Sequence, residues 1–337
     1  MKNYLFILIC CCFYNISIAE TPKVLATASM IEDMAQNIVG DLYDVVLIVP
    51  VGGDPHIYEP TPGDAKKIAQ ADLVFKNGLT FEGWLNELIA NSGTKADVIT
   101  VTDGINPITS DKYANSVDPH AWMDATLGLK YIENIKNALI KVDPTNKATY
   151  LKNYEAYRAE LIEADKYIQK VLKQIPKRQR VLITSHDAFQ YFGKKYEIQL
   201  EAILGTSTDA EVQTSDIMRL GKVIKEQQVS ALFVESTINP KLLQQLAKDN
   251  KISVGGELFA DSIGDEESGA NSYIKMLKYN ADTIFEGLNK NKSNNSTAST
   301  DTGHKLEENN SSNIFLYGIL GVLFIGGFIL AMSKMRT

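Results

Sequence analysis

The sequence predicts an α/β fold of two lobes, each a parallel β-sheet flanked by helices. One long α-helix bridges the lobes, and a C-terminal transmembrane helix follows them. Three observations support this prediction. Short runs rich in β-branched residues alternate with helical patterns in both halves of the chain. The 31 residues between Pro144 and Pro176 contain no Gly and no Pro. Residues 314–332 form a stretch of 19 residues without a charge.

The first lobe is expected at residues 20–142. Thr61 and Pro62 open one of its helices, because Thr is a good helix cap and Pro suits the first helical position. The remaining expected elements are strands at 24–27, 45–49, 71–75 and 98–101, and helices near 31–39, 83–90 and 125–140.

The long helix is expected at residues 143–176. Its apolar residues step by four and three along the chain, which indicates one buried face; they are Tyr150, Tyr154, Tyr157, Leu161, Ala164, Ile168 and Val171. Such a helix would be roughly 45 Å long, more than one small domain can cover. A coiled coil is the alternative, since the period resembles a heptad. The similar patterns on both sides favour a rigid link between two lobes.

The second lobe is expected at residues 177–288 and repeats the rhythm of the first. Alternation of strands and helices implies parallel sheets with helices on both faces. The expected strands lie at 180–184, 200–204, 231–234 and 252–254, and the expected helices near 189–196, 215–227, 241–249 and 273–288.

Residues 1–19 are typical of a secretory signal peptide. Lys2 gives a positive start, an apolar run follows, and small residues precede a cleavage point after Ala19. All three cysteines lie in this segment, so the mature chain is expected to have no disulfide. A lipid-attachment site at Cys10 would want a small residue before it, and Ile9 is not small.

The C-terminal end predicts a membrane anchor. Residues 289–313 are almost entirely polar and predict a disordered tether. Residues 314–332 are long enough to cross a bilayer, and the basic residues of the tail at 333–337 are expected to stay in the cytoplasm. The body of the protein is therefore expected on the periplasmic or extracellular face, anchored to the cytoplasmic membrane.

The net charge of the chain bears on which classes of partner it binds. The formal net charge is −7 and there is no basic cluster, which argues against a nucleic-acid-binding protein. An acidic surface is compatible with attracting cations.

Three histidines stand beyond expected strands or in turn-rich segments: His56, His120 and His186. Ligands of open α/β sheets bind at the carboxyl ends of the strands. Asp261, beyond the last expected strand, would complete a four-ligand site. Imidazole nitrogens with one carboxylate suit Zn, Mn or Fe. On spacing alone, purely structural roles for these histidines stay open as an alternative. Acids close to the histidines in sequence could orient the imidazoles, namely Asp54, Asp118, Asp124 and Asp187.

The chain resembles the solute-binding receptors of ABC-type importers for manganese, zinc and iron, the TroA-like long-helix family. The resemblance covers residues 23–288 and is carried by the segments at 54–62, 118–124, 184–192, 234–235 and 261–264. It implies the same four metal ligands and a fold of two lobes bridged by a helix. It also implies an ABC-type permease and its ATPase as partners, and a monomer that captures metal rather than an enzyme.

Three departures from the family pattern bear on this expectation. A C-terminal spanning helix is unusual in a family whose members are free in the periplasm or held by an N-terminal lipid. Zinc-dedicated members often carry a His-rich loop between the first two ligands, whereas residues 57–119 contain no His. Manganese-dedicated members often place Glu at the position of His186, and three nitrogen ligands favour Zn over Mn. The expected metal is therefore Mn²⁺ or Zn²⁺, with Fe²⁺ third.

Two other functions fit parts of the pattern. A metallohydrolase would need an open coordination position and a general base, for which Glu59 is the candidate. A surface adhesin or metal scavenger without a transport partner would suit the predicted membrane tail.

Overall fold

The computed structural model describes residues 21–109 and 117–289. In the first lobe the described strands form one parallel sheet in the order β2-β1-β3-β4. The strands are β1 (Val24–Ala26), β2 (Val46–Leu47), β3 (Leu73–Lys76) and β4 (Asp97–Thr100). Strand β1 is central and pairs with β2 on one side and β3 on the other. The parallel pairing agrees with the alternation of strands and helices in the sequence.

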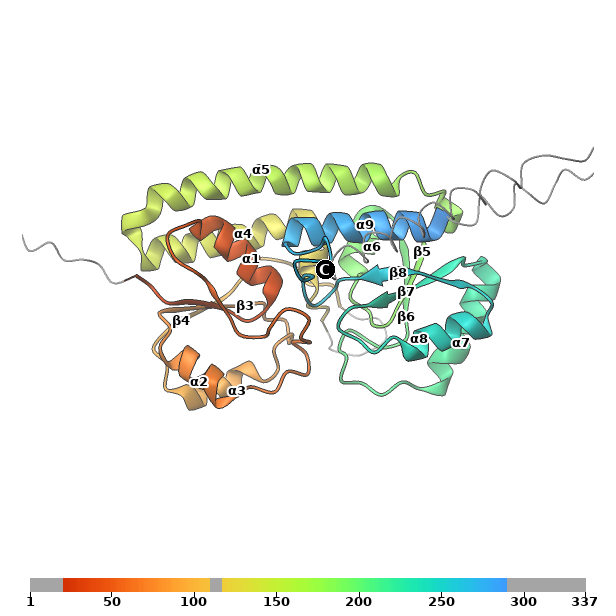
Figure 1. Ribbon diagram of the computed structural model, residues 1–337, viewed down its shortest axis with the longest axis horizontal. Coiled ribbons are helices and arrows are strands. Elements are labelled where there is room, and N and C mark those ends of the chain that lie inside the picture. Colours follow the sequence, from red (N-terminus) through yellow and green to blue (C-terminus); the bar gives the residue numbers. More distant parts are fainter. Residues whose placement is uncertain (1–20, 110–116, 290–337) are drawn as a thin grey trace, which may run out of the picture. The chain divides into compact units, whose positions relative to one another are not determined.

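Helices cover both faces of this sheet (Figure 1). They are α1 (Ser29–Val39), α2 (Pro62–Ala69), α3 (Leu85–Ser92) and α4 (Ala125–Val142). Alternate residues of β1 serve the two faces: Val24 and Ala26 pack in a cluster with α1 and α4, and Leu25 packs in another with α2 and α3. At the start of α2, Thr61 and Asp64 form a reciprocal capping box, as Thr before Pro led us to expect.

The second lobe is built from two parallel strand pairs. β5 (Val181–Thr184) pairs with β6 (Gln199–Ala202), and β7 (Ala231–Glu235) pairs with β8 (Ser253–Leu258). The helices of this part of the chain are α6 (Gln190–Tyr196), α7 (Thr214–Gln227), α8 (Lys241–Asp249) and α9 (Tyr273–Asn289). The carboxyl ends of β5 and β8 lead directly to residues of the candidate site, His186 and Asp261.

The long linking segment begins with a short 3-10 turn, Pro144–Asn146, followed by helix α5 (Lys147–Leu172) of 26 residues. At 1.5 Å per residue the α-helical part is about 39 Å long, shorter than the sequence predicted. Its buried face contains most of the predicted apolar positions: Tyr150, Tyr157, Leu161, Ala164, Ile168 and Val171 are buried, and Tyr154 is half-buried. This face packs on α1, α4 and α9 of the same chain.

The fold prediction was wrong in adding a transmembrane helix. Across residues 21–109 and 117–289, no helix combines the length and the apolarity needed to cross a membrane. The longest described helix, α5, carries charged residues along its whole length, which a bilayer core would not accommodate. The stretch named for the span, 314–332, lies outside the described residues, as do the signal peptide and, apart from Asn289 at the end of α9, the polar tether.

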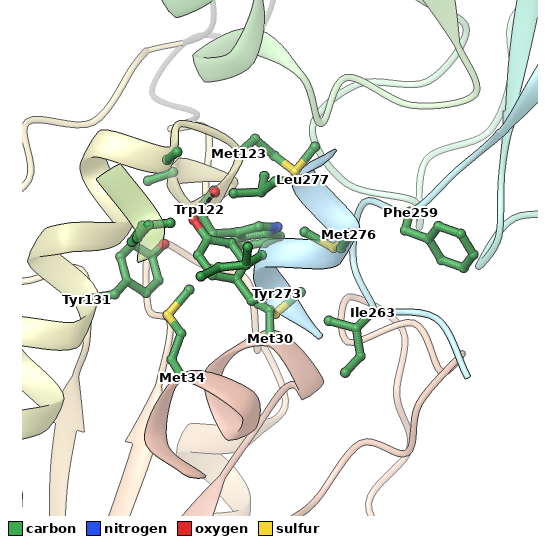
Figure 2. Packing of buried hydrophobic residues seen from close by; sticks show 14 of the residues in the cluster. Met30, Met34, Trp122, Met123, Tyr131, Phe259, Ile263, Tyr273, Met276 and Leu277 are labelled. Atoms are coloured by element: carbon green, nitrogen blue, oxygen red, sulfur yellow. Dashed lines mark hydrogen bonds between the residues drawn. The ribbon is translucent and has the colours of Figure 1, made fainter. Parts of the chain in front are cut away.

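One hydrophobic cluster contains residues from both lobes and from the helices that join them. Figure 2 shows part of it, with Trp122 and Tyr273 near its centre. Helix α9 lies beside α5 (Figure 1) and begins on the first lobe, where the Tyr273 N–H donates to Asp33 Oδ2 of α1 at 3.0 Å. The Tyr273 hydroxyl donates to the carbonyl of Trp122. The lobes are therefore joined by α9 and a shared core as well as by α5, and the domain boundaries at 142/143 and 176/177 stay predictions.

Two helical glycines in different surroundings, Gly287 of α9 and Gly221 of α7, predict opposite effects on substitution by Ala. A methyl group on Gly287 of α9 would lie 2.6 Å from the ring of Phe233, so Gly287→Ala should destabilise the fold by about 1–3 kcal/mol. A methyl group on Gly221 of α7 would meet only the Asn250 side chain at 3.8 Å, so Gly221→Ala should stabilise by up to about 1 kcal/mol. Urea unfolding of both variants checks this; stabilisation by both would contradict the packing.

Candidate metal site

His56 lies in the loop between β2 and α2. Its backbone N–H donates to Asp54 Oδ1 at 2.9 Å, and the other oxygen of Asp54 accepts from the hydroxyl of Thr208 in the second lobe at 2.6 Å. The imidazole stands edge-on to Phe81, with ring centroids 4.9 Å apart. The loop is thus fixed by a turn of its own and by a hydrogen bond across the lobes.

His120 is fully buried and is oriented by Asp118. The Asp118 Oδ1 atom accepts from the backbone N–H of His120 at 2.9 Å and from its Nδ1 at 2.7 Å. A residue of the first lobe also fixes the segment between them, because the buried Asn77 side chain donates to the carbonyl of Pro119 at 2.9 Å. With Nδ1 occupied in this way, Nε2 of His120 is left for the centre of the site.

His186 follows β5 and is held by Glu235, the last residue of β7. Glu235 Oε1 accepts from the His186 backbone N–H at 2.8 Å, and Glu235 Oε2 lies 2.6 Å from His186 Nδ1. Sequence reasoning did not find this role of Glu235. The available signal was a carboxylate ending an otherwise apolar strand, Ala-Leu-Phe-Val-Glu, where charge is seldom buried without a partner.

Asp261 is buried, and apart from the imidazoles that face it, neither of its carboxylate oxygens has a hydrogen-bond partner among the described residues. Three imidazole nitrogens face the carboxylate. Nε2 of His186 lies 3.1 Å and Nε2 of His56 3.9 Å from Asp261 Oδ2, and Nε2 of His120 lies 3.3 Å from Oδ1. A buried carboxylate is costly unless a cation compensates it, which here is a protonated imidazole in the metal-free site or a bound metal ion.

The structure brings all four residues predicted for the site together. The Nε2 atom of His120 is 3.3 Å from the Nε2 atoms of both His56 and His186, and one ligand atom from each of the four residues lies within 4.8 Å of the others. Three nitrogens and one oxygen converging at this spacing fit a tetrahedral divalent ion, and no other group of this kind occurs in residues 21–109 and 117–289.

The carboxylates set the protonation of the metal-free site. Burial lowers the pKa of each imidazole. For His56 burial dominates, and the pKa falls to about 3. For His120 the carboxylates of Asp118 and Asp261 outweigh burial and raise the pKa to about 9. Glu235 and Asp261 likewise raise the pKa of His186 well above 6.5. Burial raises the pKa of Asp261, but the neighbouring imidazoles prevail and lower it well below 3.8.

Of the four acids expected to orient the imidazoles, Asp118 forms a hydrogen bond to an imidazole ring nitrogen, that of His120. Asp54 binds the backbone of His56, Asp124 caps the start of α4 through the Thr126 N–H, and Asp187 accepts from Gln190. Asp and Glu near a histidine in sequence often serve turns and helix starts, so proximity alone could not separate these roles.

Comparison with known proteins identifies the family. The family described as "Zinc-uptake complex component A periplasmic" matches residues 24–287. The chain belongs to this family. It is 39% identical over 276 residues to the metal ABC transporter substrate-binding lipoprotein SsaB of Streptococcus sanguinis, covering 80% of this chain and 89% of that one. It is 35% identical over 269 residues to the manganese-binding lipoprotein MntA of Halalkalibacterium halodurans, with the same coverage.

Solved structures agree with this assignment. The periplasmic zinc-binding protein TroA of Treponema pallidum superposes with a TM-score of 0.76 at 30% identity, over 80% of this chain and 99% of that one. A manganese-bound periplasmic metal-binding protein of Candidatus Liberibacter asiaticus gives a TM-score of 0.73 at 30% identity, over 80% and 100%. The two-lobed α/β architecture and the resemblance found in the sequence are confirmed.

Proposed function

We propose that His56, His120, His186 and Asp261 together capture one Mn²⁺ or Zn²⁺ ion outside the cytoplasm. The chain is the substrate-binding component of a metal ABC importer, so it hands the ion to a permease driven by an ATPase. The observation that carries the proposal is the buried Asp261 carboxylate, which faces three Nε2 atoms and has no other polar partner among the described residues. A divalent cation at that point would satisfy all four groups at once.

The geometry favours capture over catalysis. Four protein ligands leave a tetrahedral ion no open position at which to activate a water molecule. Glu59, the candidate base of a hydrolase, is exposed and is not one of the four converging groups. Membership of the family of importer substrate-binding proteins likewise argues against an enzyme. The predicted membrane tail had made the adhesin alternative slightly more plausible, and residues 21–109 and 117–289 contain no helix that could span a membrane.

The choice between manganese and zinc stays open. Relatives are named for each: MntA is called manganese-binding and TroA zinc-binding. Three nitrogens favour Zn²⁺ by intrinsic affinity, but availability of the metal can reverse that order in a cell. Iron ranks third.

Metal titration of the full chain tests the proposal. Purified without added metal and then titrated separately with Mn²⁺ and Zn²⁺, the wild-type chain should bind one ion per chain. His120→Ala should lose tight binding, whereas His304→Ala, which removes the one histidine not predicted as a ligand, should keep it. Equal binding by both variants would refute the site.

Glu235→Gln should weaken metal binding by about 10- to 100-fold, because it removes the charge that orients His186 and raises its basicity. Gln still accepts from the His186 backbone N–H, so the loop should stay folded. Calorimetric titration measures the affinity. Glu226→Gln, on the exposed face of α7, is the matched control and should bind metal as wild type does.

A further inference from the structure

The segment that carries Asp261 follows β8 of the second lobe, yet residues of the first lobe hold it. The indole N–H of Trp122 donates to the carbonyl of Ala260 at 3.0 Å, on the N-terminal side of Asp261. On the other side, the N–H of Gly52 donates to the hydroxyl of Ser262 at 2.8 Å. The segment thus leaves the β7–β8 pair, and the first lobe holds it on both sides of Asp261.

Ser29 makes the central contacts of this docking. Its hydroxyl accepts from the backbone N–H of Ile263 at 3.0 Å and lies 3.1 Å from the hydroxyl of Ser262. Ser29 is 2% exposed and Ser262 1%, so water cannot replace either bond without opening the interface. Ser29 is also the first residue of α1, a helix with seven buried residues that anchor it in the first lobe.

His186 contrasts with this arrangement. Its backbone and Nδ1 contacts are to Glu235, and its carbonyl accepts from the Thr184 hydroxyl at 2.7 Å, all within the second lobe. The segment around Asp261 is therefore hydrogen-bonded to the first lobe, which carries His56 and His120. In the sequence, however, Asp261 lies in the second lobe, as His186 does.

We infer that Ser29 is a positioning residue for Asp261: through Ile263 and Ser262 it seats the acidic ligand of the metal site from the opposite lobe. This rests on the proposed function. Asp261 takes up its position as a ligand only when the segment after β8 is docked on the first lobe. The ligand set is therefore complete only when the two lobes are in contact there. Separation at this contact removes the carboxylate from the ion and leaves a site of histidines alone.

Ser29→Ala in the full chain tests this inference. The substitution removes the acceptor of the Ile263 N–H while leaving all four ligands in place. We expect Zn²⁺ affinity to fall by about 10- to 100-fold, the range for partners that orient a ligand. With Co²⁺ as the probe, the visible d–d absorption should change in position and intensity, because the carboxylate no longer holds its place in the coordination shell.

Ser92→Ala is the matched control. The Ser92 hydroxyl also accepts a backbone N–H, from Thr94, and donates to a carbonyl, that of Ile89, but these bonds stay within α3 and the turn after it. Its metal affinity and Co²⁺ spectrum should match those of wild type. If Ser29→Ala also matches wild type in both measurements, the inference is wrong. If wild type itself binds no metal, the proposed function fails instead.

Ser262→Ala provides a second route should Ser29→Ala not fold. It removes the hydroxyl that contacts Gly52 and Ser29 but leaves the Ile263–Ser29 bond. A decrease in affinity with the same spectral change is expected, and the double variant should lose less than the sum of the two single losses, since they share one contact. Unchanged affinity and spectrum in Ser262→Ala would overturn the inference.

Discussion

Asp261→Asn should abolish tight metal binding, with the affinity for Mn²⁺ and Zn²⁺ falling by at least about 100-fold, the upper end of what loss of an orienting partner costs. The amide nearly keeps the shape of the carboxylate but loses its negative charge. In the wild-type chain that charge faces three imidazoles and has no other hydrogen-bond donor among the described residues. Removing it leaves three neutral nitrogens to hold a divalent ion.

Two measurements check this expectation. Calorimetric titration gives the affinity directly, and the rise in melting temperature on adding metal gives it independently, because a ligand that binds only the folded state stabilises it. Glu257→Gln is the control: it makes the same change of charge on the exposed side of β8. Wild-type affinity in Asp261→Asn would exclude Asp261 as a ligand.

The elements of the fold were predictable because local patterns dictate them. In β1, each residue is buried, but successive side chains enter different clusters, which is why the strand reads as a short continuous apolar run. Helix α5 shows its buried stripe at steps of three and four. The start of the α-helix was missed by several residues, because Pro144 begins a 3-10 turn and not the α-helix.

The four candidate ligands were predicted partly for a topological reason and partly from the family resemblance. Chains in parallel α/β lobes leave their strands at one edge, so histidines just beyond β2 and β5 were expected to meet. The groups that orient them were harder to find. Glu235 is 49 residues from His186, and Ser29 is 234 residues from Ile263. No periodicity or motif spacing reports contacts of that range.

The shared core that joins the two lobes could not be predicted from the sequence. Helix α9 has an ordinary amphipathic pattern, and nothing in it indicates that Tyr273 would bind Asp33 and Trp122 of the first lobe. A linking helix alone would leave two separate cores. The shared cluster around Trp122 and Tyr273 (Figure 2) makes relative motion of the lobes costly, since it would expose buried aromatic surface.

Metal affinity should rise with pH across the range from about 6 to about 9, by about tenfold per unit for each proton displaced. The sign follows from the imidazoles. An ion binds neutral nitrogen, so a pKa raised by nearby carboxylates, to about 9 for His120, means that the metal-free site holds a proton that the ion must expel. Above about 9 His120 is already neutral and the slope flattens. His56, with its pKa near 3, contributes nothing in this range.

Titration calorimetry in buffers of different ionisation enthalpy counts the displaced protons. We expect at least one displaced proton per ion near neutral pH, and fewer in Asp118→Asn, where the charge that raises the pKa of His120 is gone.

The same proton also affects the stability of the metal-free protein. Because the folded pKa of His120 lies above the ordinary value of about 6.5, its stabilising effect is complete below that value and is lost as pH rises through about 9. The metal-free protein should therefore lose stability over the pH range in which metal binding strengthens, so the rise in melting temperature caused by metal should grow with pH. A metal affinity that stayed constant between about pH 6 and 9 would show that the site binds its ion without displacing a proton, and would contradict the pairing of His120 with Asp118 and Asp261.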